Sequence, residues 1–323
     1  MASNQYLTLN SGHKMPIIGL GTWQAPDTEV EAAIDVALEA GYRHIDTAPL
    51  YLNEKAIGRA LKRWLDSGKV KREELFIVTK LPTAANRARD VEATLKKSLA
   101  DLQLDYVDIY LIHSPVTAVA NEDGGVKYDA DGLMVPDLEA DITTTWTAME
   151  KLVPSGLAKS IGVSNFDQDQ LERVLKVAKI PPATNQIEHH VYLQQRDLVN
   201  FCKANGIVIT AYSPLGSKGL NKLNASAGIN RELPDLFDIP EVKEIAAAHG
   251  KTPAQVLLRW IVENGIVIIP KSTNPERVKQ NLNVFDFKLT AEEIAKLSTL
   301  DQNFRVCDWS LLRGVERHPE YHF

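Results

Sequence analysis

Short apolar runs alternate with segments of helical periodicity along most of the chain, and this alternation limits the folds that it can adopt. The eight apolar runs are 17–20, the residues around Ile45, 76–78, 109–112, 160–163, 185–187, 207–210 and 266–269. Strands that are separated by helices form a parallel sheet. Eight such units within 323 residues predict an α/β protein with a closed (β/α)8 TIM barrel.

An open, doubly wound parallel sheet is the structural alternative, and it carries a glycine-rich dinucleotide fingerprint after its first strand. At that position the chain reads Gly19-Leu-Gly21-Thr-Trp-Gln, which lacks the third glycine. The barrel is therefore favoured. The segments with helical periodicity are 30–40, 54–65, 90–102, 142–152, 168–178, 195–204, 240–248, 253–262 and 276–281.

Three kinds of segment depart from the alternation. Residues 6–9 and 14–16 flank an Asn-Ser-Gly turn and predict an N-terminal β-hairpin. The stretches 115–141 and 216–237 are long, polar loops, which are expected to shape a binding site. The segment 302–323 is rich in aromatic and aliphatic residues, and we expect it to pack over one mouth of the barrel. No linker interrupts the pattern, so a single domain over residues 1–323 is predicted.

Four polar side chains lie at or just beyond the ends of three successive predicted strands: Asp46, Tyr51, Lys80 and His113. The carboxyl ends of barrel strands share one face, where barrel enzymes carry their chemistry. Tyr51 is the candidate general acid, because a Lys80 ammonium beside it would lower the phenol pKa from about 10. Asp46 would orient Lys80, and His113 would polarise the same substrate oxygen. This group suits reduction of a carbonyl.

Each of the four residues alone also has a structural explanation. Asp46 could cap a turn, Tyr51 could pack on the surface, Lys80 could be a solvated strand end, and His113 could be a hydrogen-bonded core histidine. Spacing alone does not separate catalysis from these explanations, although the joint placement after consecutive strands favours catalysis.

Composition limits the classes of binding partner and the cellular compartment that we expect for this protein. The net charge of −6 provides no general attraction to nucleic acid or to an anionic membrane. No run approaches the roughly 20 apolar residues of a membrane helix. The two cysteines are too few for a disulfide framework, and residues 1–5 lack the features of a signal peptide. We therefore expect a cytoplasmic protein, and no metal site is predicted.

Three motifs resemble the signatures of the aldo-keto reductase family. The first signature is matched by residues 41–48 (Gly-Tyr-Arg-His-Ile-Asp-Thr-Ala) together with residues 54–58. The second resembles residues 159–166 (Lys-Ser-Ile-Gly-Val-Ser-Asn-Phe), and the third resembles residues 268–272 together with Arg277 and Asn281. The motifs keep the family's order, and the resemblance covers about residues 7–307. It implies a (β/α)8 barrel that acts as an NADPH-dependent carbonyl reductase of the aldose reductase-like branch. It also implies that the four polar residues have the roles given above and that the protein is a monomer.

The same resemblance implies which residues hold NADPH or NADP⁺. It assigns Ser164, Asn165 and Gln186 to the nicotinamide carboxamide, Tyr212 to the face of the nicotinamide ring, and Ser213, Leu215 and Ser217 to the pyrophosphate. It assigns Lys271, Ser272, Thr273 and Arg277 to the adenosine 2′-phosphate, with Thr22, Trp23, Asp46, Gln280 and Asn281 as further contacts. Lys271 and Arg277 near the start of a helix suit a phosphate dianion, although a solvated helix entry would look the same without the motif.

The substrate pocket is where the resemblance to aldose-reductase-like members of that family weakens. They have tryptophans after the catalytic Lys and His, where this chain has Pro82 and Ser114. Smaller side chains there predict a wider pocket and bulky hydrophobic or steroid-like carbonyl substrates. The candidate lining residues are Trp23, Leu50, Tyr51, His113, Ser114, Cys307 and residues 309–312. Cys307 is equally explained as a small buried hydrophobic residue.

Two other functions remain open at this stage. One is a non-enzymatic NADP-binding module on the same scaffold, against which the intact set of four polar residues argues. The other is a dehydrogenase that runs mainly toward alcohol oxidation, a direction that depends on cofactor ratios.

Overall fold

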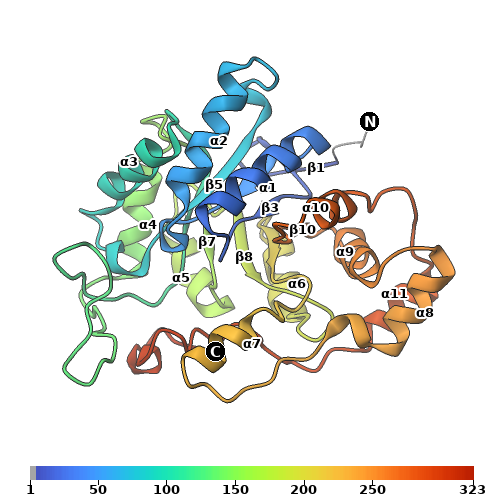
Figure 1. The fold of residues 1–323 in the computed structure, drawn as a ribbon. Coiled ribbons are helices and arrows are strands. Elements are labelled where there is room, and N and C mark those ends of the chain that lie inside the picture. The colour runs from blue at the N-terminus through green and yellow to red at the C-terminus, as the bar shows by residue number, and fades with distance from the viewer. Residues whose placement is uncertain (1–4) are drawn as a thin grey trace.

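The computed structural model describes residues 5–323, and its centre is an eight-stranded parallel sheet that closes into a barrel (Figure 1). Neighbouring strands follow chain order, from β3 to β10. The strands are β3 (Leu20–Gly21), β4 (His44–Asp46), β5 (Phe76–Leu81), β6 (Val107–Ile112), β7 (Ala158–Ser164), β8 (Thr184–Glu188), β9 (Val208–Tyr212) and β10 (Val267–Ile268). Parallel bridges from Ile18 to Ile268 and from Gly21 to Lys271 join the first strand to the last. The predicted barrel is confirmed.

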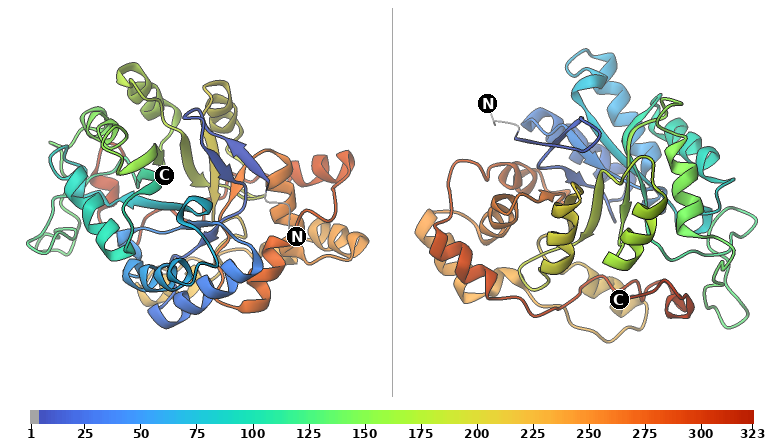
Figure 2. Two further views of the ribbon diagram at one scale, coloured as in Figure 1. Left: turned by 90° about the horizontal axis from the view of Figure 1, so that it is seen from above. Right: turned by 180° about the vertical axis from the view of Figure 1, so that it is seen from behind.

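Helices surround the barrel, as Figures 1 and 2 show. They are α1 (Asp27–Ala40), α2 (Glu54–Asp66), α3 (Val91–Leu102), α4 (Ile142–Glu150), α5 (Gln168–Val177), α6 (Arg196–Ala204), α7 (Leu220–Ser226), α8 (Pro240–His249), α9 (Pro253–Glu263), α10 (Pro275–Leu282) and α11 (Ala291–Ser298). All six residues of β5 and all six of β6 are buried, because the helices cover one side of the sheet and the barrel interior covers the other. Among the described residues, no helix is long and apolar enough to cross a membrane.

The two ends of the barrel are covered by different segments. The predicted hairpin is present as β1 (Tyr6–Thr8) and β2 (Lys14–Pro16), and it lies at the amino ends of the strands. There Ser11 Oγ is 2.7 Å from Ser160 Oγ in β7. The C-terminal tail, residues 302–323, crosses the opposite end, where the carboxyl ends of the strands meet (Figure 2). We call that end the barrel mouth. The predicted position of the tail is confirmed.

Some element boundaries differ from the sequence-based expectation. Strand β3 covers Leu20–Gly21 instead of 17–20. Helix α1 begins three residues earlier than expected, because Pro26 precedes a first turn that carries Asp27 and Glu29. Helix α7 lies inside the 216–237 loop, and α11 was not expected. A capping box between Thr290 and Glu293 stabilises the start of α11.

The tail and the 115–141 loop share a small hydrophobic core of their own. Val116, Ala118 and Met134 of the loop pack with Val315 of the tail. The backbone N–H of Met134 donates to the Arg313 carbonyl at 2.7 Å. Three antiparallel bridges, among them Ala118 with Pro136, order the loop itself. Loop and tail therefore form one continuous wall at the barrel mouth.

Candidate active site

The four polar residues singled out in the sequence meet at the barrel mouth. Asp46 ends β4, Lys80 lies in β5, and Tyr51 ends the short 3₁₀ helix η1 (Pro49–Tyr51). Lys80 Nζ donates to Asp46 Oδ1 at 2.6 Å, to the Thr47 carbonyl at 2.9 Å and to Tyr51 Oη at 3.1 Å. The Tyr51 and His113 rings lie edge to face, with their centroids 5.9 Å apart.

The ammonium of Lys80 is kept charged in a completely buried position. Burial by itself lowers the Lys80 pKa, but the Asp46 carboxylate and the Tyr51 hydroxyl outweigh it and raise the pKa above its ordinary value. Lys80 has no exposed surface and the Asp46 side chain is 2% exposed, so water screens the pair very little. The three donor contacts of Lys80 match the three N–H bonds of an ammonium.

The pKa of Tyr51 shifts opposite to the sequence-based expectation. Lys80 was expected to lower it, and Lys80 does act in that direction, but burial of the phenol is the larger effect and raises the pKa above its ordinary value. Burial cannot be read from spacing, which is why the expectation was wrong. Tyr51 therefore carries its proton throughout the neutral range.

His113 is a neutral imidazole next to this cation. Burial lowers its pKa well below the ordinary value, and the Lys80 charge lowers it further. Its Nδ1 is buried and has no hydrogen-bond partner among the described residues. The ring of Trp309, from the tail, lies edge-on to it at 5.6 Å between centroids. A neutral His113 offers one N–H and one acceptor nitrogen.

The residues expected at the nicotinamide carboxamide are tied to the same group. Gln186 Nε2 donates to Asp46 Oδ2 at 2.7 Å. Asn165 lies in the left-handed region, with φ at 62°, and its Nδ2 donates to the His113 carbonyl at 2.9 Å. Its Oδ1 accepts from the Tyr212 hydroxyl at 2.7 Å, and Ser164 Oγ lies 3.1 Å from Asn165 Nδ2. The contacts place these residues around the mouth beside His113.

The loop after β9 begins with two non-glycine residues in the left-handed region. Ser213 has φ at 49° and Ser217 at 41°. Their hydroxyls are joined, because Ser217 Oγ donates to Ser213 Oγ at 2.7 Å. Leu215 between them packs against the main hydrophobic core. The strained turn directs the chain away from β9 and across the mouth.

Two cations gather near the start of α10. Lys271 and Arg277 are exposed, and neither forms an ion pair with an acidic side chain within residues 5–323. Although the residue is exposed, partial desolvation of its ammonium lowers the pKa of Lys271, Glu29 opposes this, and the Arg277 charge lowers it further. Asn274 caps the helix by accepting from the Arg277 backbone N–H at 3.0 Å. The remaining expected residues here are Ser272 and Asn281, which are buried, Thr273, which is half-buried, and Gln280, which is exposed.

The expected substrate-lining residues lie in different environments. Leu50 is half exposed, whereas Ser114 is completely buried and its Oγ accepts from the Val116 N–H at 3.1 Å. Trp23 and Cys307 pack in one small cluster at the mouth, and Cys307 Sγ lies 3.5 Å from Ser213 Oγ. Thr22 Oγ1 donates to the Asp46 carbonyl at 2.8 Å. The structure therefore places Trp23 and Cys307 against the same hydrophobic cluster and encloses Ser114.

Glu188 is a residue at this end of the barrel that sequence reasoning did not single out. It ends β8, two positions after Gln186, and it is completely buried. Its carboxylate accepts from the backbone N–H groups of Val306 at 2.6 Å and Cys307 at 2.7 Å. The alternation of side chains along a strand puts Glu188 on the same face as Gln186. That period-2 relation was the available signal.

Comparisons with known proteins agree on one family. Residues 17–302 match the model described as the aldo/keto reductase family. The chain is 47% identical to mouse (Mus musculus) aldo-keto reductase family 1 member A1 over 92% of its own length and 89% of that protein. It is 45% identical to the chicken (Gallus gallus) protein of that name, over 100% of its own length and 98% of the length of that protein. The structure of aldose reductase from Schistosoma japonicum superposes with a TM-score of 0.88 at 39% identity, over 99% of this chain and 98% of that one.

Proposed function

This chain belongs to the aldo/keto reductase family of oxidoreductases that act on carbonyl groups, and from this premise we propose that it reduces aldehydes and ketones to alcohols with NADPH. Tyr51 is the proton donor in this proposal. The observation that carries it is the 3.1 Å contact between Tyr51 Oη and the buried Lys80 ammonium. A phenol that holds its proton at neutral pH, next to a fixed cation, is prepared to give that proton to a substrate.

Proton transfer breaks the Tyr51 O–H bond and forms the O–H bond of the alcohol. The transfer leaves a phenolate on Tyr51, and Lys80 stabilises it because the two groups are already in contact. Asp46 keeps Lys80 charged and oriented through the 2.6 Å bond. Preorganised charges of this kind, here a buried ammonium and carboxylate, lower the barrier without reorganisation during the reaction.

His113 has a different role, because its low pKa keeps the imidazole neutral. We assign to it the donation of a hydrogen bond to the carbonyl oxygen of the substrate, from the one N–H that a neutral ring carries. The Asn165 side chain holds the His113 carbonyl and the Tyr212 hydroxyl, and so supports the position of the imidazole. The reacting oxygen would then be shared between His113 and Tyr51.

The donor set at the mouth fits a nicotinamide dinucleotide phosphate. When bound, NADPH supplies the hydride. Lys271 and Arg277 lie near one another without carboxylate partners among the described residues, and a phosphate dianion would offset their mutual repulsion. Residues that would hold the remainder of the cofactor are Thr22, Trp23, Asp46, Ser164, Asn165, Gln186, Tyr212, Ser213, Leu215, Ser217, Ser272, Thr273, Gln280 and Asn281.

The apolar side chains at the mouth favour hydrophobic substrates. Leu50 is half exposed beside Tyr51, and Trp309 stands next to His113. We propose that bulky hydrophobic carbonyls, steroid-like ones included, are accepted between these side chains. Trp23 and Cys307, from one cluster, would form the side of the pocket nearest the tail.

A panel of carbonyl compounds tests the proposal directly. We expect consumption of NADPH, followed by its absorbance at neutral pH, with at least one aromatic aldehyde or hydrophobic ketone. Tight NADPH binding without turnover of any carbonyl would instead identify a non-enzymatic NADP-binding module. Turnover measured only with alcohols and NADP⁺ would identify a dehydrogenase that runs toward oxidation.

A further inference from the structure

Two consecutive backbone N–H groups of the tail are bound by a single buried carboxylate. Val306 N–H donates to Glu188 Oε1 at 2.6 Å, and Cys307 N–H donates to Glu188 Oε2 at 2.7 Å. We call this contact the mouth anchor. Hydrogen bonds to an ionised acceptor are among the stronger ones in proteins, and these two lie where no water competes for the carboxylate.

The mouth anchor stands just before the part of the tail that reaches the reacting groups. Trp309 follows two residues after Cys307 and has φ at 60°, a conformation that a tryptophan rarely adopts. Its ring lies edge-on to His113, which in turn lies edge-on to Tyr51. The position of the Trp309 ring therefore depends on where the backbone of residues 306 and 307 is held.

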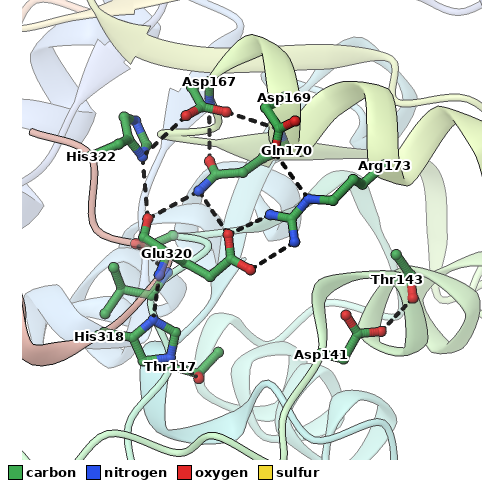
Figure 3. Close-up of polar contacts among 12 residues, drawn as sticks. Thr117, Asp141, Thr143, Asp167, Asp169, Gln170, Arg173, His318, Glu320 and His322 are labelled. Atoms are coloured by element: carbon green, nitrogen blue, oxygen red, sulfur yellow. Dashed lines mark hydrogen bonds and ion pairs between the residues drawn. The ribbon is translucent and has the colours of Figure 1, made fainter.

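The other end of the tail is held separately on helix α5. Figure 3 shows Glu320 between Gln170 and Arg173. Gln170 Nε2 donates to the Glu320 carbonyl at 3.0 Å, and Arg173 Nη1 donates to Glu320 Oε1 at 2.9 Å. We call this contact the outer anchor. The segment between the two anchors, which carries Trp309, is thus fixed at both ends.

We propose that Glu188 is a positioning residue that influences substrate selection. It fixes the backbone of the tail at residues 306 and 307, and with it the position of the Trp309 ring at the pocket. This inference rests on the proposed carbonyl reductase function. Within residues 5–323, Glu188 forms no hydrogen bond with Asp46, Tyr51, Lys80 or His113, so it acts through the tail. Its one titratable hydrogen-bond partner in that range is His190, whose Nε2 lies 2.8 Å from Oε1.

Glu188→Gln removes one acceptor while keeping the size of the side chain. A glutamine can accept from one of the two N–H groups, but its NH₂ then faces the other, so the mouth anchor is halved. Loosening the tail should affect a substrate that reaches Trp309 more than one that does not. We expect KM to rise about tenfold for a biphenyl aldehyde and to change less than about twofold for propanal, with NADPH affinity unchanged.

Glu150 provides a control for the loss of a buried carboxylate charge. It too is a buried glutamate that accepts from two consecutive backbone N–H groups, those of Lys179 at 2.5 Å and Ile180 at 2.8 Å, but both bonds end on Oε1, so a glutamine there can keep both. That contact lies before β8, at the opposite end of the barrel. Glu150→Gln should therefore leave the ratio of the KM values for the two aldehydes unchanged. A KM ratio that moves equally in the two variants would mean that the loss of a buried carboxylate, and not the loss of the tail contact, is responsible.

Hydrogen exchange of the tail separates this inference from the function on which it rests. Amide exchange in residues 303–309, measured by mass spectrometry, should accelerate at least about tenfold in Glu188→Gln and not in Glu150→Gln. Unchanged exchange, or faster exchange with an unchanged KM ratio, would overturn the role of Glu188. If the wild-type protein reduces neither aldehyde nor any other carbonyl, the proposed function fails instead, and the exchange result still decides whether Glu188 holds the tail.

Discussion

Lys80 and Asp46 form an ion pair inside the barrel, with Nζ and Oδ1 2.6 Å apart and almost no exposed surface on either side chain. The second oxygen of Asp46 accepts from Gln186, so the carboxylate links the proposed proton donor to the residues proposed to hold the nicotinamide. A change at this pair should therefore affect both stability and turnover, and the two effects can be separated by the choice of variant.

Asp46→Asn should destabilise the protein, because it leaves the Lys80 ammonium buried without a counter-charge. Removing one partner of a buried pair costs about 3–5 kcal/mol. The double variant Asp46→Asn with Lys80→Met should regain part of that stability in urea unfolding but no turnover. The exposed pair Lys62–Asp66 is the control, and Asp66→Asn there should cost less than about 1 kcal/mol. Equal losses at the two sites would contradict the buried pair's role.

Tyr51→Phe should lower kcat by about 10²–10⁴-fold, which is the usual contribution of a positioned proton donor. NADPH affinity, measured by fluorescence quenching, should stay within about twofold, because the variant removes only the hydroxyl. Tyr128→Phe, at an exposed tyrosine of the 115–141 loop, should change neither quantity. Near-normal turnover in Tyr51→Phe would show that another group supplies the proton.

Arg277→Ala should weaken NADPH binding by about tenfold and NADH binding by less than about twofold, since only NADPH carries the 2′-phosphate. Lys279→Ala is the matched control. It removes a cation from the same helix, but this cation pairs with Glu276 at 3.2 Å. Dissociation constants of both cofactors for the three proteins provide the measurement. The same loss of affinity for NADH as for NADPH would argue against the phosphate site.

The outer anchor should weaken in acid. Burial alone would raise the pKa of Glu320, but hydrogen bonds from Arg173 and Gln170 lower it below its ordinary value near 4.5. A carboxylate with a lowered pKa in the folded state contributes stability that is fully present above its ordinary pKa and is lost as the pH falls through the lower folded value. His318 titrates in a different range, because burial lowers its pKa below its ordinary value near 6.5, and the stability that its neutral form contributes is lost as the pH falls from about 6.5 toward the lower folded value.

The fluorescence of Trp309, taken as the difference between wild type and Trp309→Phe, should change as the pH falls below about 4.5. Glu320→Gln should show a smaller change, because it has lost the titrating group. A transition of equal size in the two proteins would place the acid sensitivity elsewhere.

The barrel could be predicted because eight apolar runs and their helices alternate, and the pairs Ile18–Ile268 and Gly21–Lys271 close the ring as such a fold requires. Two helices were missed for different reasons. Helix α7 is a seven-residue helix within a polar loop, without an apolar stripe that its sequence makes visible. Helix α11 had a signal in the capping box of Thr290 and Glu293, which apolar periodicity alone does not reveal.

The convergence of Asp46, Tyr51, Lys80 and His113 followed from topology, because parallel strands bring their carboxyl ends together. The direction in which the pKa of Tyr51 shifts did not follow from topology. It depends on whether burial of the phenol, which raises the pKa, has a larger effect than the nearby Lys80 charge, which lowers it. The enclosure of Ser114 depended in the same way on packing, since its hydroxyl turns back to the Val116 N–H. The balance between burial and the effect of a neighbouring group depends on the three-dimensional packing, which sequence spacing does not give.

The mouth anchor has a consequence for how this protein can change over evolutionary time. Glu188 binds the tail through main-chain N–H groups, and every amino acid except proline supplies one. These two hydrogen bonds therefore require no particular side chain at residues 306 and 307 beyond the exclusion of proline, and the neighbouring side chains can change while the bonds remain. Substitutions around Trp309 could therefore change the accepted substrate while the main-chain contact that holds the tail remains.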